Sequence, residues 1–215
     1  LEDLITDANP DAVVLEGTES DDTFLLPAAP ATVFAGDGTD TVRTEAAIGD
    51  VDIARDEATG VVSITRGESG QTAALASVER VEFSDSTVLF GLSEQAETTY
   101  LLYAAGLGRT PDEDGLLFWT DQLEAGASVD EIAGRFAESE EFAARFGGGL
   151  SDAEFVDTLY RNVLGREADT AGEGFWEETL ASPSFDRADA LLAFAESPEN
   201  REQQAQNIED GLIVA

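Results

Sequence analysis

The strongest constraint on the fold is a pattern that occurs twice in the second half of the chain. Aligned on itself at one constant shift, the chain brings Gly108-Arg109 onto Gly165-Arg166 and Phe118-Trp119 onto Phe175-Trp176. Self-similarity at a fixed shift indicates a repeated structural unit, so we expect two related units at about residues 98–150 and 151–211. Further positions that match are Leu102 and Leu159, Tyr103 and Tyr160, Asp112 and Asp169, Gly115 and Gly172, Leu123 and Leu180 and, with one inserted residue, Phe136–Ser139 and Phe194–Ser197.

Signals for helix starts lie at corresponding places in the two copies. Thr110, Ser128 and Ser151 are each followed three residues later by Glu, the pattern of a capping box. Pro111 and Pro198 stand where the first turn of a helix accepts proline. Apolar residues then recur at spacings of three and four. The second half therefore predicts roughly eight helices in two related sets.

The first half carries an apolar residue at every ninth position. Leu15, Phe24, Val33, Val42 and Val51 follow this period. A period of nine fits a coil in which each half-turn is a tight loop followed by a short strand, whose apolar residue faces inward. We therefore expect short strands that stack coil upon coil.

Two of the loops in this region end in an aspartate followed by threonine. Asp22 and Asp40 lie two of these periods apart, and each follows a Gly or Ala by five positions. Gly36 and Gly38 give the second loop the permissive backbone that a tight turn needs. These loops resemble the repeats-in-toxin, or haemolysin-type calcium-binding, repeat Gly-Gly-x-Gly-x-Asp-x-apolar-x.

The resemblance implies a β-roll in which loops two periods apart stack and share a Ca²⁺ ion. Asp22 and Asp40 would then face the same ion with their carboxylates. Backbone carbonyl groups would complete the shell, and the residues that this implies are Thr18, Ser20, Gly36 and Gly38.

The intervening repeat departs from the family pattern. Within residues 27–32, Ala31 stands at the position of the aspartate, so we expect no ion at the opposite edge of the coil. An alternative interpretation also stays open for the two aspartates. Asp22 and Asp40 are then turn residues that accept hydrogen bonds from their own backbone, as Asp often does in loops.

From Val51 to Leu89 the period of nine gives way to ordinary strand patterns. Alternation with period two predicts antiparallel strands. We expect these strands to cap the β-roll and cover its last edge. The strands expected are Val51–Arg55, Val61–Thr65 and Thr72–Leu75, followed by the alternating stretch Val78–Asp85 and by Val88-Leu89.

Composition limits the chemistry that is available. The chain has 46 acidic residues against 11 Arg, a net charge of −35, and no Lys, His, Cys or Met. This charge excludes nucleic acid as a partner and disfavours anionic membranes, and no apolar run is long enough to span a bilayer. Without His or Cys, a His-based triad and a thiolate nucleophile are both impossible. Carboxylate and carbonyl oxygens instead suit a hard ion, above all Ca²⁺.

The loop that begins at Thr110 offers a second possible calcium site. Asp112, Asp114 and Asp121 fall at positions three, five and twelve of an EF-hand-like count, and Asp169 falls at position three of the equivalent loop of the second copy. A simpler interpretation is that Asp112 and Asp169 stabilise helix N-termini, where a carboxylate meets unpaired N–H groups.

The repeated aromatic and basic residues also allow two interpretations each. Trp119 and Trp176 lie at helical spacing among leucines, which favours core anchors over platforms for sugar rings. Arg109 and Arg166 favour structural salt bridges over binding of a ligand carboxylate. An enzyme would need a carboxylate pair from distant segments, because adjacent glutamates on one helix cannot flank a single bond.

The run Gly-Arg-x-x-Asp-x-x-Gly-x-x-Phe-Trp-x-x-x-Leu, present once in each copy, resembles a secreted bacterial family known only as domain of unknown function 4214. The resemblance covers Leu92 to Gly211 and implies an all-helical domain with no assigned catalytic residues. Such domains accompany repeats-in-toxin segments in surface-layer proteins, adhesins and exported enzymes. The tail Glu209–Ala215 resembles the export signals of one-step secretion, although a final helix that docks its apolar end would look the same.

These patterns together predict an α+β chain in two segregated parts. We expect a calcium-binding β-roll with an antiparallel cap at residues 1–92 and a duplicated all-α domain at residues 93–215. The function that they favour is a non-catalytic calcium-binding module of a secreted or cell-surface bacterial protein. One alternative is a helical domain that binds a polysaccharide or a surface protein through exposed aromatics, and another is a hydrolase with a carboxylate pair.

Overall fold

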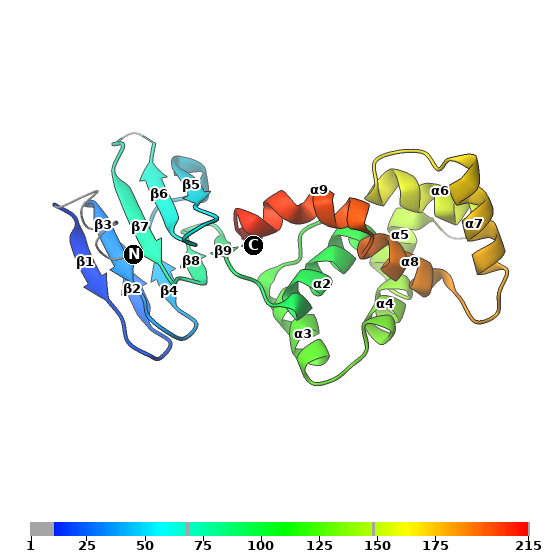
Figure 1. Ribbon diagram of the computed structural model, residues 1–215, viewed down its shortest axis with the longest axis horizontal. Helices are drawn as coiled ribbons and strands as arrows, with labels where there is room; N and C mark the ends of the chain where they lie inside the picture. The colour runs from blue at the N-terminus through cyan, green and yellow to red at the C-terminus, as the bar shows by residue number, and fades with distance from the viewer. Residues whose placement is uncertain (1–10, 68, 148, 215) are drawn as a thin grey trace. The chain divides into compact units, whose positions relative to one another are not determined.

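The computed structural model describes residues 11–214 except 68 and 148, and the chain forms two compact units (Figure 1). The β unit combines the residues up to Leu92 with those from Asn207 onward, and the helical unit is Ser93–Gln206. The predicted α+β class with segregated parts is confirmed. The expected helical domain ran to the C-terminus, whereas the last residues group with the β unit instead.

Three coils of parallel strands form the centre of the β unit. Each coil contributes one strand to each of two sheets, so that β1, β3 and β7 are neighbours in one sheet and β2, β4 and β8 in the other. The first two coils are offset by two of the predicted periods, with Val13 opposite Ala31 and Thr23 opposite Thr41. The six strands are β1 Val13–Glu16, β2 Thr23–Leu25, β3 Ala31–Phe34, β4 Thr41–Arg43, β7 Thr72–Ala76 and β8 Arg80–Glu82.

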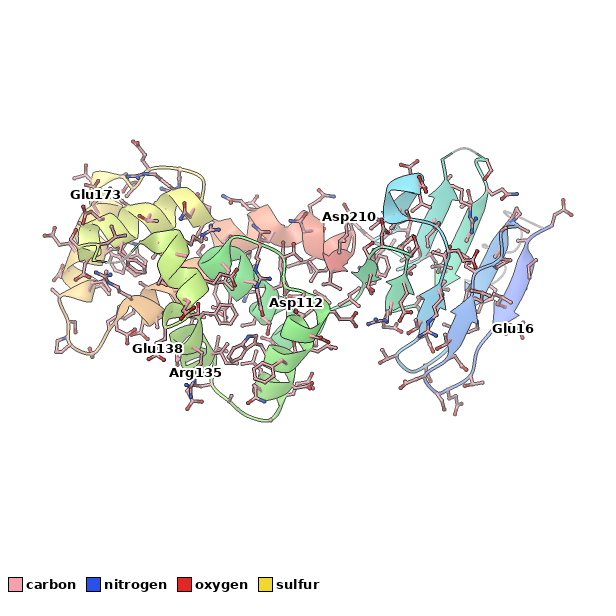
Figure 2. The ribbon with its side chains drawn as sticks, turned by 180° about the vertical axis from the view of Figure 1, so that it is seen from behind. Glu16, Asp112, Arg135, Glu138, Glu173 and Asp210 are labelled. Carbon is pink, nitrogen blue, oxygen red and sulfur yellow. The ribbon has the colours of Figure 1, made fainter. Side chains whose placement is uncertain are left out.

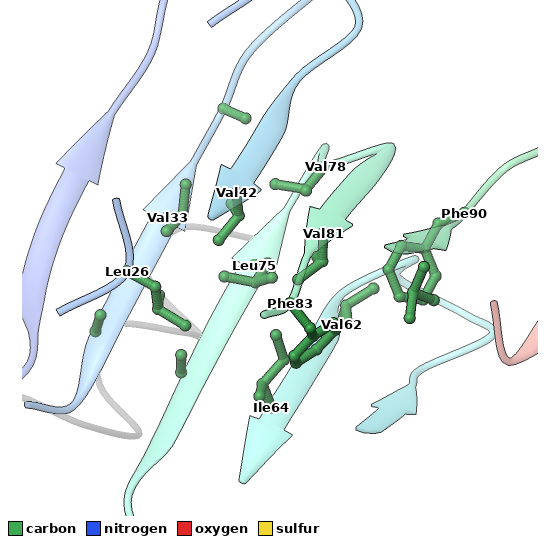
Figure 3. Close-up of a cluster of buried hydrophobic side chains, with 14 residues drawn as sticks. Leu26, Val33, Val42, Val62, Ile64, Leu75, Val78, Val81, Phe83 and Phe90 are labelled. Carbon is green, nitrogen blue, oxygen red and sulfur yellow. The ribbon is translucent and has the colours of Figure 1, made fainter. Parts of the chain in front are cut away.

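The residues on the period of nine face the core of this unit, as predicted. Val33 and Val42 are fully buried, and Leu15, Phe24 and Val51 pack against the same cluster. Figure 3 shows side chains from both sheets meeting between them. A strand pair with one apolar face reaches stability only when that face is covered, and here each sheet covers the other.

The expectation of an antiparallel cap from Val51 to Leu89 is wrong in part. The strands β5 Val51–Arg55 and β6 Val62–Arg66 do pair antiparallel with each other, after a short 3₁₀ turn, η1, at Ile48–Asp50. However, β7 and β8 pair parallel with β3 and β4 and form the third coil. Because β5 and β6 are inserted before β7, the regular spacing of the coils breaks, and alternation alone does not encode the direction of a strand.

The last edge of each sheet is covered by antiparallel strands. One sheet ends in β6 and β5, and the other in β9 Thr87–Leu89 and β10 Leu212–Val214. The C-terminal tail thus forms a strand on β9, with Leu212 and Val214 buried. The expected alternative of a helix that docks its apolar end is wrong at these residues, while the export signal stays a prediction.

Eight α-helices and one five-residue π-helical turn, η2, form the described part of the helical unit. Ser128 and Ser151 cap their helices in complete capping boxes, as predicted, and Pro198 opens the last helix. At Thr110 the prediction is wrong, because Asp112 is the N-cap and Pro111 precedes the helix. The elements are α2 Glu94–Leu102, η2 Tyr103–Leu107, α3 Glu113–Glu124, α4 Val129–Ala137, α5 Glu140–Phe146, α6 Asp152–Val163, α7 Thr170–Leu180, α8 Arg187–Ala195 and α9 Pro198–Glu209.

The two sequence copies correspond helix by helix. α2 with η2 matches α6, α3 matches α7, α4 matches α8, and α5 matches α9. The matched helices α4 and α8 pack against each other, and α8 also packs on α2 and η2. Each copy therefore covers apolar surface of the other.

Candidate functional site

The loops that connect the two sheets stack along one edge of the β unit. Asp22, Asp40 and Glu79 occupy equivalent places in the three coils, each directly before a strand of the second sheet. Asp40 Oδ1 accepts the backbone N–H of Asp22 at 2.8 Å, and Glu79 Oε2 accepts the N–H of Asp40 at 2.9 Å. The structure therefore brings the two predicted aspartates onto adjacent coils and adds a third carboxylate to the row.

Asp22 also stabilises its own loop. Its Oδ2 accepts the backbone N–H of Thr18 at 2.7 Å and the Thr18 hydroxyl at 2.8 Å, and the backbone N–H of Ser20 binds the same hydroxyl at 3.2 Å. These hydrogen bonds agree with the alternative interpretation, in which Asp22 is a turn residue that accepts hydrogen bonds from its own loop. Asp22 is thus committed to its loop, whereas Asp40 reaches across to the neighbouring coil.

Gly36 and Gly38 let the second loop lie directly on the first. Both have a left-handed backbone, with φ of 107° and 121°. A Cβ at Gly36 would lie 1.9 Å from the carbonyl oxygen of Thr18, and one at Gly38 would lie 2.8 Å from the backbone of Ser20. The predicted need for glycine is therefore physical, since any side chain would push the loops apart.

Asp40 is the one predicted ligand that is fully buried. It is 0 % exposed, and its Oδ2 has no hydrogen-bond partner within the described residues. A buried carboxylate oxygen without a partner loses its hydration and gains nothing in return. Asp40 Oδ2 is therefore where the loop edge would gain most from a cation.

The sequence pattern does not mark Glu79 as a ligand. Its loop, between β7 and β8, is shorter than the other two and lacks glycine, so it does not resemble a calcium repeat. One signal was available, because Glu79-Arg80-Val81 repeats the order acid, any residue, apolar of Asp40-Thr41-Val42.

In the helical unit, the EF-hand-like interpretation does not fit. Asp112 Oδ1 accepts the N–H of Gly115 at 2.8 Å and caps α3, and Asp169 caps α7 through Gly172 at 2.7 Å. Asp114 and Asp121 lie within α3, about 10 Å apart along the helix axis, so they cannot converge on one ion. Within the described residues, no three acidic side chains gather in a group that would hold a metal ion.

The repeated arginines form repeated ion pairs, as the sequence favoured. Arg109 binds Glu141 with Nε–Oε1 at 2.5 Å and Nη2–Oε2 at 3.0 Å. Arg166 binds Glu199 in the same way, with both distances at 2.7 Å. Hydrogen bonds from the guanidinium lower the pKa of the Glu141 carboxyl below its ordinary value and raise the pKa of Arg109.

Each guanidinium also lies over a repeated tyrosine ring. Arg109 is 5.1 Å from the ring centre of Tyr103, and Arg166 is 4.9 Å from that of Tyr160. Burial, and then the negative charge of Asp112, raise the pKa of the Tyr103 hydroxyl. The tyrosines in turn meet Phe136 and Phe194 edge to face, at 4.9 Å in both copies.

The repeated ion pairs and aromatic contacts lie in a part of the chain that matches a known protein family. The family described as domain of unknown function (DUF4214) matches the chain twice, over residues 87–146 and 133–204. The chain belongs to the DUF4214 family. A search of curated proteins finds no match. Within the described part of the chain, none of the helices has the length and apolarity needed to cross a bilayer.

In this DUF4214 chain, the repeated motif maps onto packing contacts. Its Arg forms the ion pair, its Asp caps a helix, and its Gly leaves room for the tyrosine hydroxyl, which a Cβ at Gly115 would approach to 2.4 Å. Its Trp packs on a phenylalanine of the next helix, at 5.5 Å for Trp119 and 5.0 Å for Trp176. The motif therefore holds together the fold of each DUF4214 copy.

The phenylalanine of the motif differs from its neighbours. Phe118 and Phe175 are 55 % and 59 % exposed, and each lies edge-on to the half-buried Trp that follows it. The tryptophans are core anchors rather than open platforms, as the sequence favoured. The exposed aromatic surface of the DUF4214 unit is thus phenylalanine.

Proposed function

We propose that the chain is a non-catalytic, calcium-stabilised module of a secreted or cell-surface bacterial protein. The observation that carries this proposal is Asp40 Oδ2, a fully buried carboxylate oxygen with no partner in the described part of the chain. It lies at the edge where loops resembling calcium repeats stack. Side chains such as Glu16 and Glu173, which project from the surface (Figure 2), belong to an excess of acids that external cations would relieve.

The ligand atoms at this edge are of the chemical type that calcium prefers. Asp, Glu, threonine hydroxyl and backbone carbonyl groups supply the hard oxygen atoms that Ca²⁺ prefers, and none of the softer ligands of other metals is available. Asp40 would supply a charged ligand. Because Asp22 Oδ2 is engaged by Thr18, the remaining ligands would come from the carbonyl groups of the stacked loops, near Thr18, Ser20, Gly36 and Gly38.

Calcium titration of the whole chain tests the proposal. Ca²⁺ is expected to raise the melting temperature by more than Mg²⁺ does at equal ionic strength, because general screening treats the two ions alike. Asp40→Asn should abolish most of this excess, while its amide oxygen still accepts the N–H of Asp22. Asp37→Asn removes the same charge from an exposed position of the same loop and should keep the excess.

Three results would overturn the proposal. They are no excess of Ca²⁺ over Mg²⁺, an equal excess in the Asp40→Asn and wild-type chains, or an equal loss in both variants. The last result would mean that calcium acts only through the overall charge of the chain.

A second candidate function is supported by Phe118 and Phe175. Two large apolar side chains exposed at equivalent places of a repeat offer paired contact points for a polysaccharide or a surface protein. Because each packs on a Trp, a ligand stacked on it should change the Trp emission. Titration with soluble dextran tests the polysaccharide form, and Phe118→Ala with Phe175→Ala should remove the change. Leu117→Ala, at a neighbour that is 49 % exposed, is the matched control.

A further inference from the structure

The helical unit contains a small pocket between its two copies. Its volume is about 290 Å³. The described residues that line it include no acid, although the chain has 46 acidic residues. Its polar lining comes from α2, the loop after η2, α5, α6 and α9, and consists of Tyr100, Arg109, Thr110, Arg145, Asn162 and Gln204.

Arg145 is the unusual member of this lining. Arg109 is already neutralised by Glu141, but Arg145 has no carboxylate within salt-bridge distance among the described residues. Its Nη2 lies 3.4 Å from the carbonyl oxygen of Asn162, and its guanidinium lies 5.9 Å from the ring centre of Phe146. Its Nε is buried without a partner, and burial lowers the pKa of Arg145.

The second copy shows that the fold does not need a cation here. The one-residue insertion that aligns Phe136 with Phe194 also aligns Arg145 with Gln203. Gln203 donates its amide N–H to the carbonyl of Leu164 at 3.2 Å, a neutral helix-end contact. A glutamine therefore suffices for packing in one copy, while the other carries a positive charge beside a pocket.

Gly108 makes room for this charge. Its backbone is left-handed, with φ of 64°, and a Cβ on it would fall 1.0 Å from Nη1 of Arg145. The equivalent Gly165 has a similar φ of 66° but nothing within 4 Å of the place of a Cβ. The guanidinium thus occupies space that glycine alone leaves open, at the wall of the pocket.

We propose that this pocket binds a small monoanionic carboxylate, held by the guanidinium of Arg145. The planar fork of arginine matches a carboxylate in geometry, and a partly buried cation without a counter-charge gains most from a bound anion. The field of a chain with net charge −35 repels a dianion about twice as strongly as a monoanion, which disfavours phosphate.

The rest of the lining indicates what the carboxylate is attached to. Thr110 and Asn162 contribute a hydroxyl and an amide side chain, while the Tyr100 hydroxyl donates to Oε1 of Gln204 at 2.7 Å. The volume lies near the lower limit of small-molecule pockets, about 300 Å³. A single ring that carries hydroxyl groups and one carboxylate, such as a sugar acid, satisfies both conditions. This inference does not depend on calcium.

Calorimetric titration of the whole chain in calcium-free buffer tests the proposal. D-glucuronate is the probe, with D-glucose and inorganic phosphate as comparisons. Glucuronate should bind, glucose should not, and phosphate should bind at least tenfold more weakly. Arg145→Gln, which places the residue of the second copy in the first, should weaken glucuronate binding at least tenfold. Arg145→Lys keeps the charge but not the fork and should lose most of the preference over phosphate.

The control is Arg135→Gln, which removes the same charge from an exposed site on α4, where Arg135 and Glu138 are labelled in Figure 2. It should change the affinity less than twofold. The proposal is overturned if glucuronate does not bind, or if Arg145→Gln binds it as the wild type does. Equal binding of phosphate would also overturn it, because the pocket would then select charge alone.

Discussion

Arg109 holds both carboxylate oxygens of Glu141, which lies far along the chain in the same copy. The pair joins the loop before α3 to the first turn of α5, so it ties the second and the last helix of the first copy together. Arg166 and Glu199 do the same in the second copy. A bidentate pair that recurs at equivalent places is a repeated structural ion pair of the helical unit, and its contribution to stability can be measured.

Replacing Arg109 by Gln should lower the free energy of unfolding of the helical unit by about 1 kcal/mol, the upper range for a partly exposed pair. The side chains of Arg109 and Glu141 are 41 % and 45 % exposed, so solvent screens much of their attraction. Urea denaturation followed by Trp fluorescence measures the loss, and Glu141→Gln completes a double-mutant cycle. Arg161→Gln, which breaks a single 3.1 Å contact with Asp157, should show weaker coupling. A coupling energy of zero between Arg109 and Glu141 would show that the ion pair does not stabilise the helical unit.

The same pair predicts a dependence on pH. The pKa of Glu141 is lowered in the folded chain, first by its hydrogen bonds with Arg109. A lowered pKa means that the pair stabilises the fold above the ordinary pKa of Glu and that this contribution is lost as pH falls through the folded-state value. The difference in melting temperature between the wild type and Glu141→Gln should therefore shrink from about pH 6 to about pH 3. Protonation of the other acids relieves charge repulsion in both chains, so its effect cancels when the two melting temperatures are subtracted at each pH. A difference that stays constant with pH would contradict the prediction.

The sequence predicted the coil wherever the spacing was regular and failed where it was interrupted. Val33 and Val42 face the core because the period of nine repeats a loop and a strand. The third coil escaped notice, since β5 and β6 are inserted before β7 and the next loop is short. Its strands align through parallel pairing with β3 and β4, and the direction of that pairing is a long-range property of the folded sheet that the local sequence does not encode.

The candidate site shows the same limit. Asp22 and Asp40 were found because their loops share a spacing, and their contact follows from the regular length of the coil. The sequence does not reveal Arg145, because what distinguishes this residue is that no acid lies near it in the folded chain. That depends on the packing of α5 against elements distant in sequence. Comparison of the two copies offered one hint, since Gln203 stands in the equivalent place.

Gly115→Ala should destabilise the helical unit by about 1–3 kcal/mol, the usual cost of overpacking. The added Cβ would lie 2.4 Å from the hydroxyl of Tyr103, and the same distance separates a Cβ at Gly172 from Tyr160. Tyr103→Phe removes that hydroxyl and should recover part of the loss in the double variant. Urea denaturation followed by Trp fluorescence is again the measurement.

Gly134→Ala is the matched control for this prediction. Gly134 lies inside α4, and a Cβ there would meet nothing within 4 Å. The change should be neutral or should stabilise the chain by up to about 1 kcal/mol, because Ala favours helix over Gly. Equal destabilisation by Gly115→Ala and Gly134→Ala would show that the tyrosine contact is not the cause.

Leu212→Ala should destabilise the β unit by about 2–5 kcal/mol, the range for truncating a buried leucine. Leu212 is 2 % exposed and stands opposite Leu89 on β9, so the C-terminal tail contributes to the core of a unit whose other strands lie far earlier in the chain. Hydrogen exchange of the β8 and β9 amides should accelerate in this variant. Ile213→Ala, at a neighbour that is 52 % exposed on the same strand, should leave the exchange nearly unchanged. Unchanged exchange in Leu212→Ala would mean that β10 is dispensable to the sheet and that the tail is free to serve another role, such as export.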